Sequence, residues 1–178
     1  MKLENKNIKL RKLKPSDASF ISSCARDKNI TKYTSVLIPP CGLMDARKFI
    51  NNTVHNINKK ISYEFGIELV EEKKIVGLVN FLNINYKNKN ANIGIWLDKQ
   101  YWGRGISKDA LGLMLKFGFS NLKLNRIQAR VLSGNIRSQK LMEKMRFKLE
   151  GRLRRKTFFN NKWFDDLIYG LLKSEFKK

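Results

Sequence analysis

The hydrophobic pattern changes its period between residues 97 and 106, and this change restricts the fold more than any other feature. Ile93 to Leu97 ends a run typical of a strand, whereas the residues after Gly105 are spaced as on one face of a helix. The connecting loop is Gln100-Tyr101-Trp102-Gly103-Arg104-Gly105. Its glycines permit tight turning and close approach of a ligand to the backbone. Helix-start N–H groups favour phosphate, and Arg104 can add a charge-assisted contact. The segment therefore predicts a pyrophosphate site.

Two other phosphate loops are excluded by the same residues. The Walker pattern requires Gly-Lys-Ser/Thr after four intervening residues, and this loop lacks it. The dinucleotide fingerprint requires a third glycine, and position 108 is lysine. Taken alone, the loop is also compatible with an ordinary glycine turn before a helix.

The rest of the chain predicts strands and helices along one domain, residues 1–178. Strands are expected at 8–13, 61–71, 75–85, 91–97, 126–132, 147–159 and 163–172. Helices are expected from Pro15 to about Arg26, at 45–58, from Gly103 to Phe117 and at 135–144, with a break at 39–42. Short turns predict an antiparallel meander over 61–97 and a closing hairpin around 160–162. The class is therefore α+β, or mixed α/β.

Charge is the most unusual global property, with 37 Lys and Arg against 15 Asp and Glu, a net +22. A polyanionic partner is one interpretation. Compositional bias is the other, because lysine, asparagine and isoleucine are all abundant and share A/T-rich codons. The lysines are scattered and no nucleic-acid-binding motif is recognised, so direct nucleic-acid binding is not expected as the main function.

Cysteine and histidine are scarce. Cys24 and Cys41 form no CxxC pair and are expected to be free thiols, and with His55 as the sole histidine no metal site is expected. No apolar run reaches the roughly 18 residues of a membrane span, and the polar start lacks the apolar stretch of a signal peptide. We therefore expect a cytoplasmic protein, monomeric or homodimeric, with no membrane partner.

Several motifs match one known family. The loop at 100–105 resembles the Q/R-x-x-G-x-G/A signature of the GNAT superfamily, which holds the pyrophosphate of acetyl-CoA. Asn135 to Ser138, followed by Lys144 to Phe147, resembles its N-x-x-S helix and K-x-G-F element. The segment 161–165 and the opening at 10–18 resemble the Rim-type branch, the ribosomal-protein N-terminal acetyltransferases. The likeness covers nearly the whole chain.

The resemblance implies a mainly antiparallel sheet, splayed at its middle and flanked by helices, with acetyl-CoA between the strand ending at Leu97 and the strand 126–132. Asn135 would meet the pantetheine arm, with helix capping as the alternative role. Ser138 would lie near the thiol as a catalytic group, with a solvated helix serine as the alternative. The implied cofactor-binding residues are Ile95, Trp96, Leu97, Gln100, Trp102, Gly103, Arg104, Gly105, Ile106, Ser107, Asn135 and Ser138.

Three positions depart from the family pattern. Asn92 stands where relatives often carry an acid, Met142 falls in the stretch where many carry a tyrosine, and Arg146 replaces a glycine. An amide is no base at neutral pH, Met142 cannot donate a proton, and Arg146 must tolerate a left-handed backbone. Three further carboxylates are possible bases, although surface or hairpin roles are expected for them: Glu64, Glu68 and Asp165.

These departures bear on the acceptor. An α-amine, with a pKa near ~8, is partly neutral at physiological pH, whereas a lysine amine near ~10.4 is almost wholly charged. An enzyme without a strong base suits the former. The sequence therefore predicts acetyl transfer from acetyl-CoA to a primary amine, with a protein N-terminus, ribosomal or other, favoured. A polyamine or aminoglycoside acceptor, or a non-catalytic acyl-CoA-binding module, remains the alternative.

Overall fold

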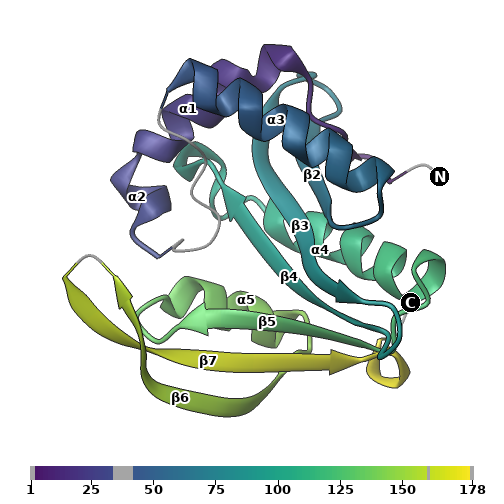
Figure 1. The fold of residues 1–178 in the computed structure, drawn as a ribbon, viewed down its shortest axis with the longest axis vertical. Helices are drawn as coiled ribbons and strands as arrows, with labels where there is room; N and C mark the ends of the chain where they lie inside the picture. The colour runs from purple at the N-terminus through teal and green to yellow at the C-terminus, as the bar shows by residue number, and fades with distance from the viewer. Residues whose placement is uncertain (1–2, 34–41, 160, 177–178) are drawn as a thin grey trace.

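The computed structural model describes residues 3–33, 42–159 and 161–176 (Figure 1). Its strands are β1 (Ile8–Arg11), β2 (Tyr63–Leu69), β3 (Ile75–Asn85), β4 (Asn90–Leu97), β5 (Arg126–Leu132), β6 (Lys148–Phe159) and β7 (Lys162–Leu172). Its α-helices are α1 (Ala18–Arg26), α2 (Lys28–Thr31), α3 (Leu43–Asn58), α4 (Ile106–Lys116) and α5 (Ile136–Lys144). Its short helical turns are η1 (Pro15–Asp17), η2 (Lys99–Tyr101), η3 (Phe117–Asn121) and η4 (Lys173–Glu175).

One seven-stranded sheet organises the chain, in the order β1-β2-β3-β4-β5-β7-β6. From β1 to β4 each strand pairs antiparallel with the next, which confirms the meander predicted for 61–97. The β6–β7 hairpin returns antiparallel beside β5. Only β4 and β5 run parallel. The mixed, mainly antiparallel sheet expected from the sequence is thus confirmed.

The sheet separates between β4 and β5. The two strands pair at three positions, from Asn90 with Arg126 to Asn92 with Gln128. Beyond them β4 continues to Leu97 and β5 to Leu132 without a recorded pair between them. Figure 1 shows the two strands leaving a shared corner near the C-terminus and moving apart along their length. The splayed sheet implied by the family resemblance is therefore present.

Helices cover both faces of the β1–β4 half (Figure 1). Alternate residues of β3 point to opposite sides: Val79 and Phe81 pack in the core that includes α4, and Leu78 packs in the core that includes α1 and α3. All three side chains are at most 2% exposed. Burial of one such side chain contributes about 1.5–3 kcal/mol, so both helical layers are held by the hydrophobic effect.

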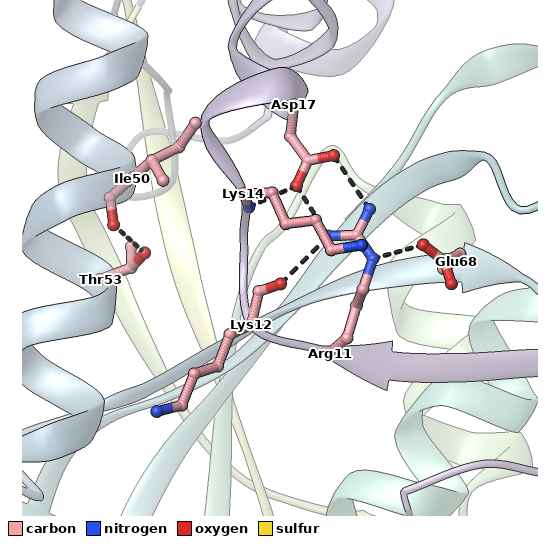
Figure 2. A network of polar contacts seen from close by, with 7 residues as sticks. All are labelled: Arg11, Lys12, Lys14, Asp17, Ile50, Thr53 and Glu68. Atoms are coloured by element: carbon pink, nitrogen blue, oxygen red, sulfur yellow. Dashed lines mark hydrogen bonds and ion pairs between the residues drawn. The ribbon is translucent and has the colours of Figure 1, made fainter.

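A partly buried ion network fixes the N-terminal layer to the sheet (Figure 2). The Arg11 guanidinium donates to both carboxylate oxygens of Asp17, at 2.7 and 2.9 Å, and to the carbonyl of Lys12 at 3.0 Å. It also forms an ion pair with Glu68 of β2. Hydrogen bonding to Asp17 raises the pKa of Arg11, so the charge is retained. The network joins the start of α1 to two strands, and Glu68 is committed to this structural role.

Some local details differ from the structure expected from the sequence. Helix α4 begins at Ile106 rather than Gly103, because both loop glycines have left-handed backbones, and Phe117 belongs to a π-helical turn after α4. Helix α2 was not expected; Asp27 caps it by accepting a hydrogen bond from the amide of Asn29 at 2.7 Å. The expected break at 39–42 lies, apart from Gly42, outside the described residues.

Across the described residues, no helix combines the length and the apolar character needed to cross a membrane.

Helix α5 ends at a non-glycine residue in the left-handed region, as the sequence predicted. Arg146 has φ 64° and is exposed. Its N–H donates to Glu143 at 2.9 Å, and the N–H of Phe147 donates to Met142 at 3.0 Å. These two bonds form a Schellman motif, which normally carries glycine at this position. The hydrogen bonds of the turn are therefore complete, but the backbone of Arg146 is strained.

Replacement of Arg146 by glycine should therefore stabilise the protein. Relief of the left-handed strain exceeds the added flexibility of the unfolded chain, giving about 1 kcal/mol and roughly a 3 °C higher Tm. Thermal unfolding followed by circular dichroism measures the shift. Lys140→Gly, in the right-handed interior of the same helix, should lower Tm by a similar amount. A lower Tm for Arg146→Gly would show that the arginine side chain stabilises the turn.

Candidate active site

The glycine loop leaves a helix start open to a ligand. Gly103 and Gly105 have φ values of 79° and 78°, and no atom lies within 4 Å of where a Cβ would be built on either. Gly105 is the N-cap of α4 and makes no side-chain cap bond; the first helical bond runs from Asp109 N–H to its carbonyl at 3.1 Å. The N–H groups of residues 106–108 precede that bond and have no partner within the helix. This arrangement fits the pyrophosphate of acetyl-CoA.

Trp102 joins the loop to its surroundings. Its indole N–H donates to the carbonyl of Leu97 at 2.9 Å. The guanidinium of Arg137, on α5, lies 3.9 Å from the centre of its ring. Arg104 is exposed and lies over the ring of Tyr101 at 5.2 Å. The tryptophan thus links the end of β4 with α5 across the opening of the sheet.

The start of α5 faces the same opening. Asn135 is the N-cap, and its side-chain carbonyl accepts the N–H of Ser138 at 3.1 Å. The capping role predicted for Asn135 is therefore confirmed. The amide nitrogen of the same side chain is not used in that bond and can donate to a ligand. Ser138 is half-buried in the first turn, rather than fully solvated.

Two cavities meet between the separated strands. The larger, of about 410 Å³, is lined by six predicted cofactor residues besides Ser138: Ile95, Trp96, Leu97, Trp102, Ser107 and Asn135. The smaller, of about 230 Å³, extends toward Asn80, Asn83 and Asn92. Ile95, Asn135, Ser138 and Tyr33 line both cavities. The predicted residues from β4 and α5 are thus brought together at one continuous site.

The remaining predicted cofactor residues lie at the edge of this site. Gln100, Gly103, Arg104 and Gly105 are exposed and are not among the cavity-lining residues. Ile106 points into the core at 6% exposure, so only its backbone can face a ligand. The roles of all these residues toward acetyl-CoA stay predictions. Their positions match a ligand whose phosphates lie outside and whose arm enters between the strands.

The candidate bases separate into different environments. Asp165 is bound to Arg152 and to the N–H of Arg155, and that backbone bond is the main cause of its lowered pKa. Glu68 is held by Arg11. Glu64 contradicts the expected surface role, since it is buried at 8% exposure, and desolvation raises its pKa. Its face of the sheet is covered by helices, which the alternating pattern of β2 could not reveal.

The smaller cavity is uncharged over most of its wall. Four asparagines line it, at positions 80, 83, 92 and 135, and Met142 lies where relatives often carry a tyrosine. No aspartate or glutamate is among its described lining residues. Its one cation, Arg130, is paired with Asp166 at 2.9 Å. Sequence reasoning missed Tyr33, Asn80 and Asn83; the one signal was the asparagine at position 80 within the otherwise apolar run 75–82.

Comparison with known proteins agrees with this architecture. A family model of the acetyltransferase (GNAT) domain matches residues 7–148. An uncharacterized N-acetyltransferase, p20, of Bacillus licheniformis is 30% identical over 98% of this chain and 97% of its own length. The putative ribosomal N-acetyltransferase YdaF of Bacillus subtilis is 27% identical over 97% of this chain and 95% of its own. The crystal structure of spermidine N-acetyltransferase from Vibrio cholerae with CoA and spermine superposes with a TM-score of 0.85, at 26% identity, covering 96% of this chain and 98% of that one.

The chain belongs to the GNAT acetyltransferase family. It is an acetyl-CoA-dependent N-acetyltransferase, and its resemblance to ribosomal-protein acetyltransferases is confirmed. The relatives also include a spermidine acetyltransferase, so the family alone does not select the amine.

A glutamate at position 105 should abolish tight binding of acetyl-CoA. Gly105→Glu places a side chain and a negative charge at the open start of α4 and strains a φ of 78°. Isothermal calorimetry should show at least a hundredfold rise in Kd. Gly112→Glu is the matched control, because it adds the same charge farther along α4, where a Cβ also meets no atom within 4 Å. If a folded Gly105→Glu protein binds acetyl-CoA as tightly as the wild type, the start of α4 is not the pyrophosphate site.

Proposed function

We infer that the enzyme acetylates the N-terminal α-amine of a protein. The single observation that carries this inference is the asparagine-lined smaller cavity, which has no carboxylate among its described lining residues. A polyamine brings several positive charges and requires compensating acids when it is desolvated. A peptide N-terminus brings one amine, which is partly neutral near its pKa of ~8. The uncharged wall suits the second acceptor.

Net charge supports the same acceptor. The chain carries 37 basic and 15 acidic residues, and like charges disfavour approach of a polycation. The likeness to the putative ribosomal N-acetyltransferase YdaF is compatible with a protein acceptor. Polyamine acetylation is the second candidate, because spermidine acetyltransferase of Vibrio cholerae is a relative of similar identity over nearly the whole chain.

The proposed chemistry is direct attack of the neutral amine on the acetyl thioester that acetyl-CoA supplies. Asn92 lines the cavity but cannot act as a base, so the amine reaches the site unprotonated or loses its proton to water. Backbone N–H groups near Leu97 would polarise the acetyl carbonyl. Ser138, which lines both cavities, would donate a hydrogen bond to the departing sulfur, since Met142 has no proton to give.

Removal of the Ser138 hydroxyl tests this role. Ser138→Ala should lower kcat about tenfold or more and leave KM for acetyl-CoA within twofold, because the hydroxyl acts on the departing sulfur and not on substrate binding. Thiol release from acetyl-CoA, followed with a thiol reagent, gives both constants. Lys140→Ala, an exposed change on the same helix, serves as the control. An unchanged kcat would show that Ser138 has no catalytic role and is only part of the first turn of α5.

An acceptor panel tests the substrate class. We expect kcat/KM for a hexapeptide with a free N-terminal serine to exceed that for spermidine or an aminoglycoside at least tenfold. The rate should rise with pH through the pKa of the α-amine, near ~8, because the neutral amine is the nucleophile. Mass spectrometry of the products identifies the acetylated nitrogen. A wide preference for spermidine would overturn the protein acceptor and leave the acetyltransferase assignment intact.

A further inference from the structure

A polar row crosses the sheet beside the smaller cavity. Glu64 of β2 pairs in register with Asn80 of β3, and Asn80 pairs with Gly94 of β4. Directly paired residues share a face of the sheet. Asn80 and Gly94 line the cavity, and Glu64 lies behind them. The row therefore runs from the interior of the β1–β4 half to the opening beside β4.

The two side chains are buried and face each other across the β2–β3 ladder. Glu64 is 8% exposed and Asn80 is 2% exposed. The hydrogen bond from Asn80 lowers the pKa of Glu64, against the larger effect of burial, which raises it. In its ionised form Glu64 only accepts, so it takes the amide N–H of Asn80 and leaves the amide oxygen on the other side. That oxygen, Oδ1, has no hydrogen-bond partner among the described residues.

An unpartnered oxygen in a buried amide requires a reason, because nearly all such atoms are satisfied. Asn80 belongs to the cavity wall, and its neighbour across the ladder, Gly94, has no side chain to cover it. Oδ1 itself is buried, so a small shift of the cavity wall would bring it into contact with a molecule in the cavity. The atom accepts only, so its natural partner is a donor, and a primary amine is a donor.

We propose that Asn80 receives the acceptor amine through Oδ1 and that Glu64 is a positioning residue that holds the Asn80 amide in this orientation. The inference rests on the proposed acceptor site, and it applies to any primary amine. One N–H of the amine binds Oδ1, which leaves the nitrogen lone pair free for the thioester. A neutral amide also avoids the stabilisation of the ammonium form that a carboxylate would produce. The amine is thereby fixed without being made less nucleophilic.

Kinetics of four variants test the pair, with the serine hexapeptide and spermidine as acceptors. Asn80→Ala should raise KM for the amine at least tenfold and leave the calorimetric Kd for acetyl-CoA within twofold. Glu64→Leu should do the same, and the double variant should be no worse than either single one. Glu64→Gln should retain an amine KM within threefold of wild type, since its amide oxygen can still accept from Asn80. If Asn80→Ala does not fold, Asn80→Ser carries the same expectation.

Val79→Ala is the control for truncation of β3, because Val79 faces the opposite core. It should lower Tm without changing the amine KM. Three results would overturn the proposal. The effects of the Asn80 and Glu64 substitutions on the amine KM could be additive, or Glu64→Gln could be as defective as Glu64→Leu. Binding of the amine and of acetyl-CoA could also be weakened equally. If spermidine is acetylated and the peptide is not, the protein acceptor fails, while the spermidine constants still decide the role of Asn80.

Discussion

The early end of pairing between β4 and β5 is the constraint on which the rest of the structure depends. After three residue pairs, the facing edges of the two strands no longer bond to each other. Backbone groups in a protein interior require partners, so such an edge calls for water or a ligand with amides of its own. The cavities and both helix starts meet at this gap. Binding site and fold are consequently one feature.

The candidate site is lined by backbone and neutral polar groups, whereas the acidic side chains form ion pairs in other parts of the structure. Acidic side chains at positions 17, 68, 150, 165, 166 and 175 form ion pairs. In the Arg11–Asp17 pair and the Arg130–Asp166 pair the aspartate side chain is at most 6% exposed, so removal of its arginine would leave a buried charge. The scarce carboxylates thus hold elements together, which leaves the cavity wall to asparagines.

Local features could be predicted from the sequence, and long-range ones could not. The glycine loop, the Asn135 cap and the left-handed Arg146 each follow from residue type and immediate neighbours. Contacts between distant segments decide that β7 lies between β5 and β6. They also decide that Tyr33 and Ser138 line the same cavity. Glu64 is the instructive case. The alternation of β2 marks one apolar face, and only the packing of α1 and α3 shows that the other is buried too.

Burial of Glu64 changes what the loss of the family's acid at Asn92 means. A carboxylate at the cavity wall would extract protons and also attract cations, whereas Glu64 stands one strand behind the wall, with Asn80 between it and the cavity. Glu64 does not line the cavity, so in the proposed arrangement the site orients an amine more than it deprotonates it. Such a site gains most from an acceptor that is already neutral. The wall of asparagines and the proposed preference for a weakly basic amine are therefore two consequences of one arrangement.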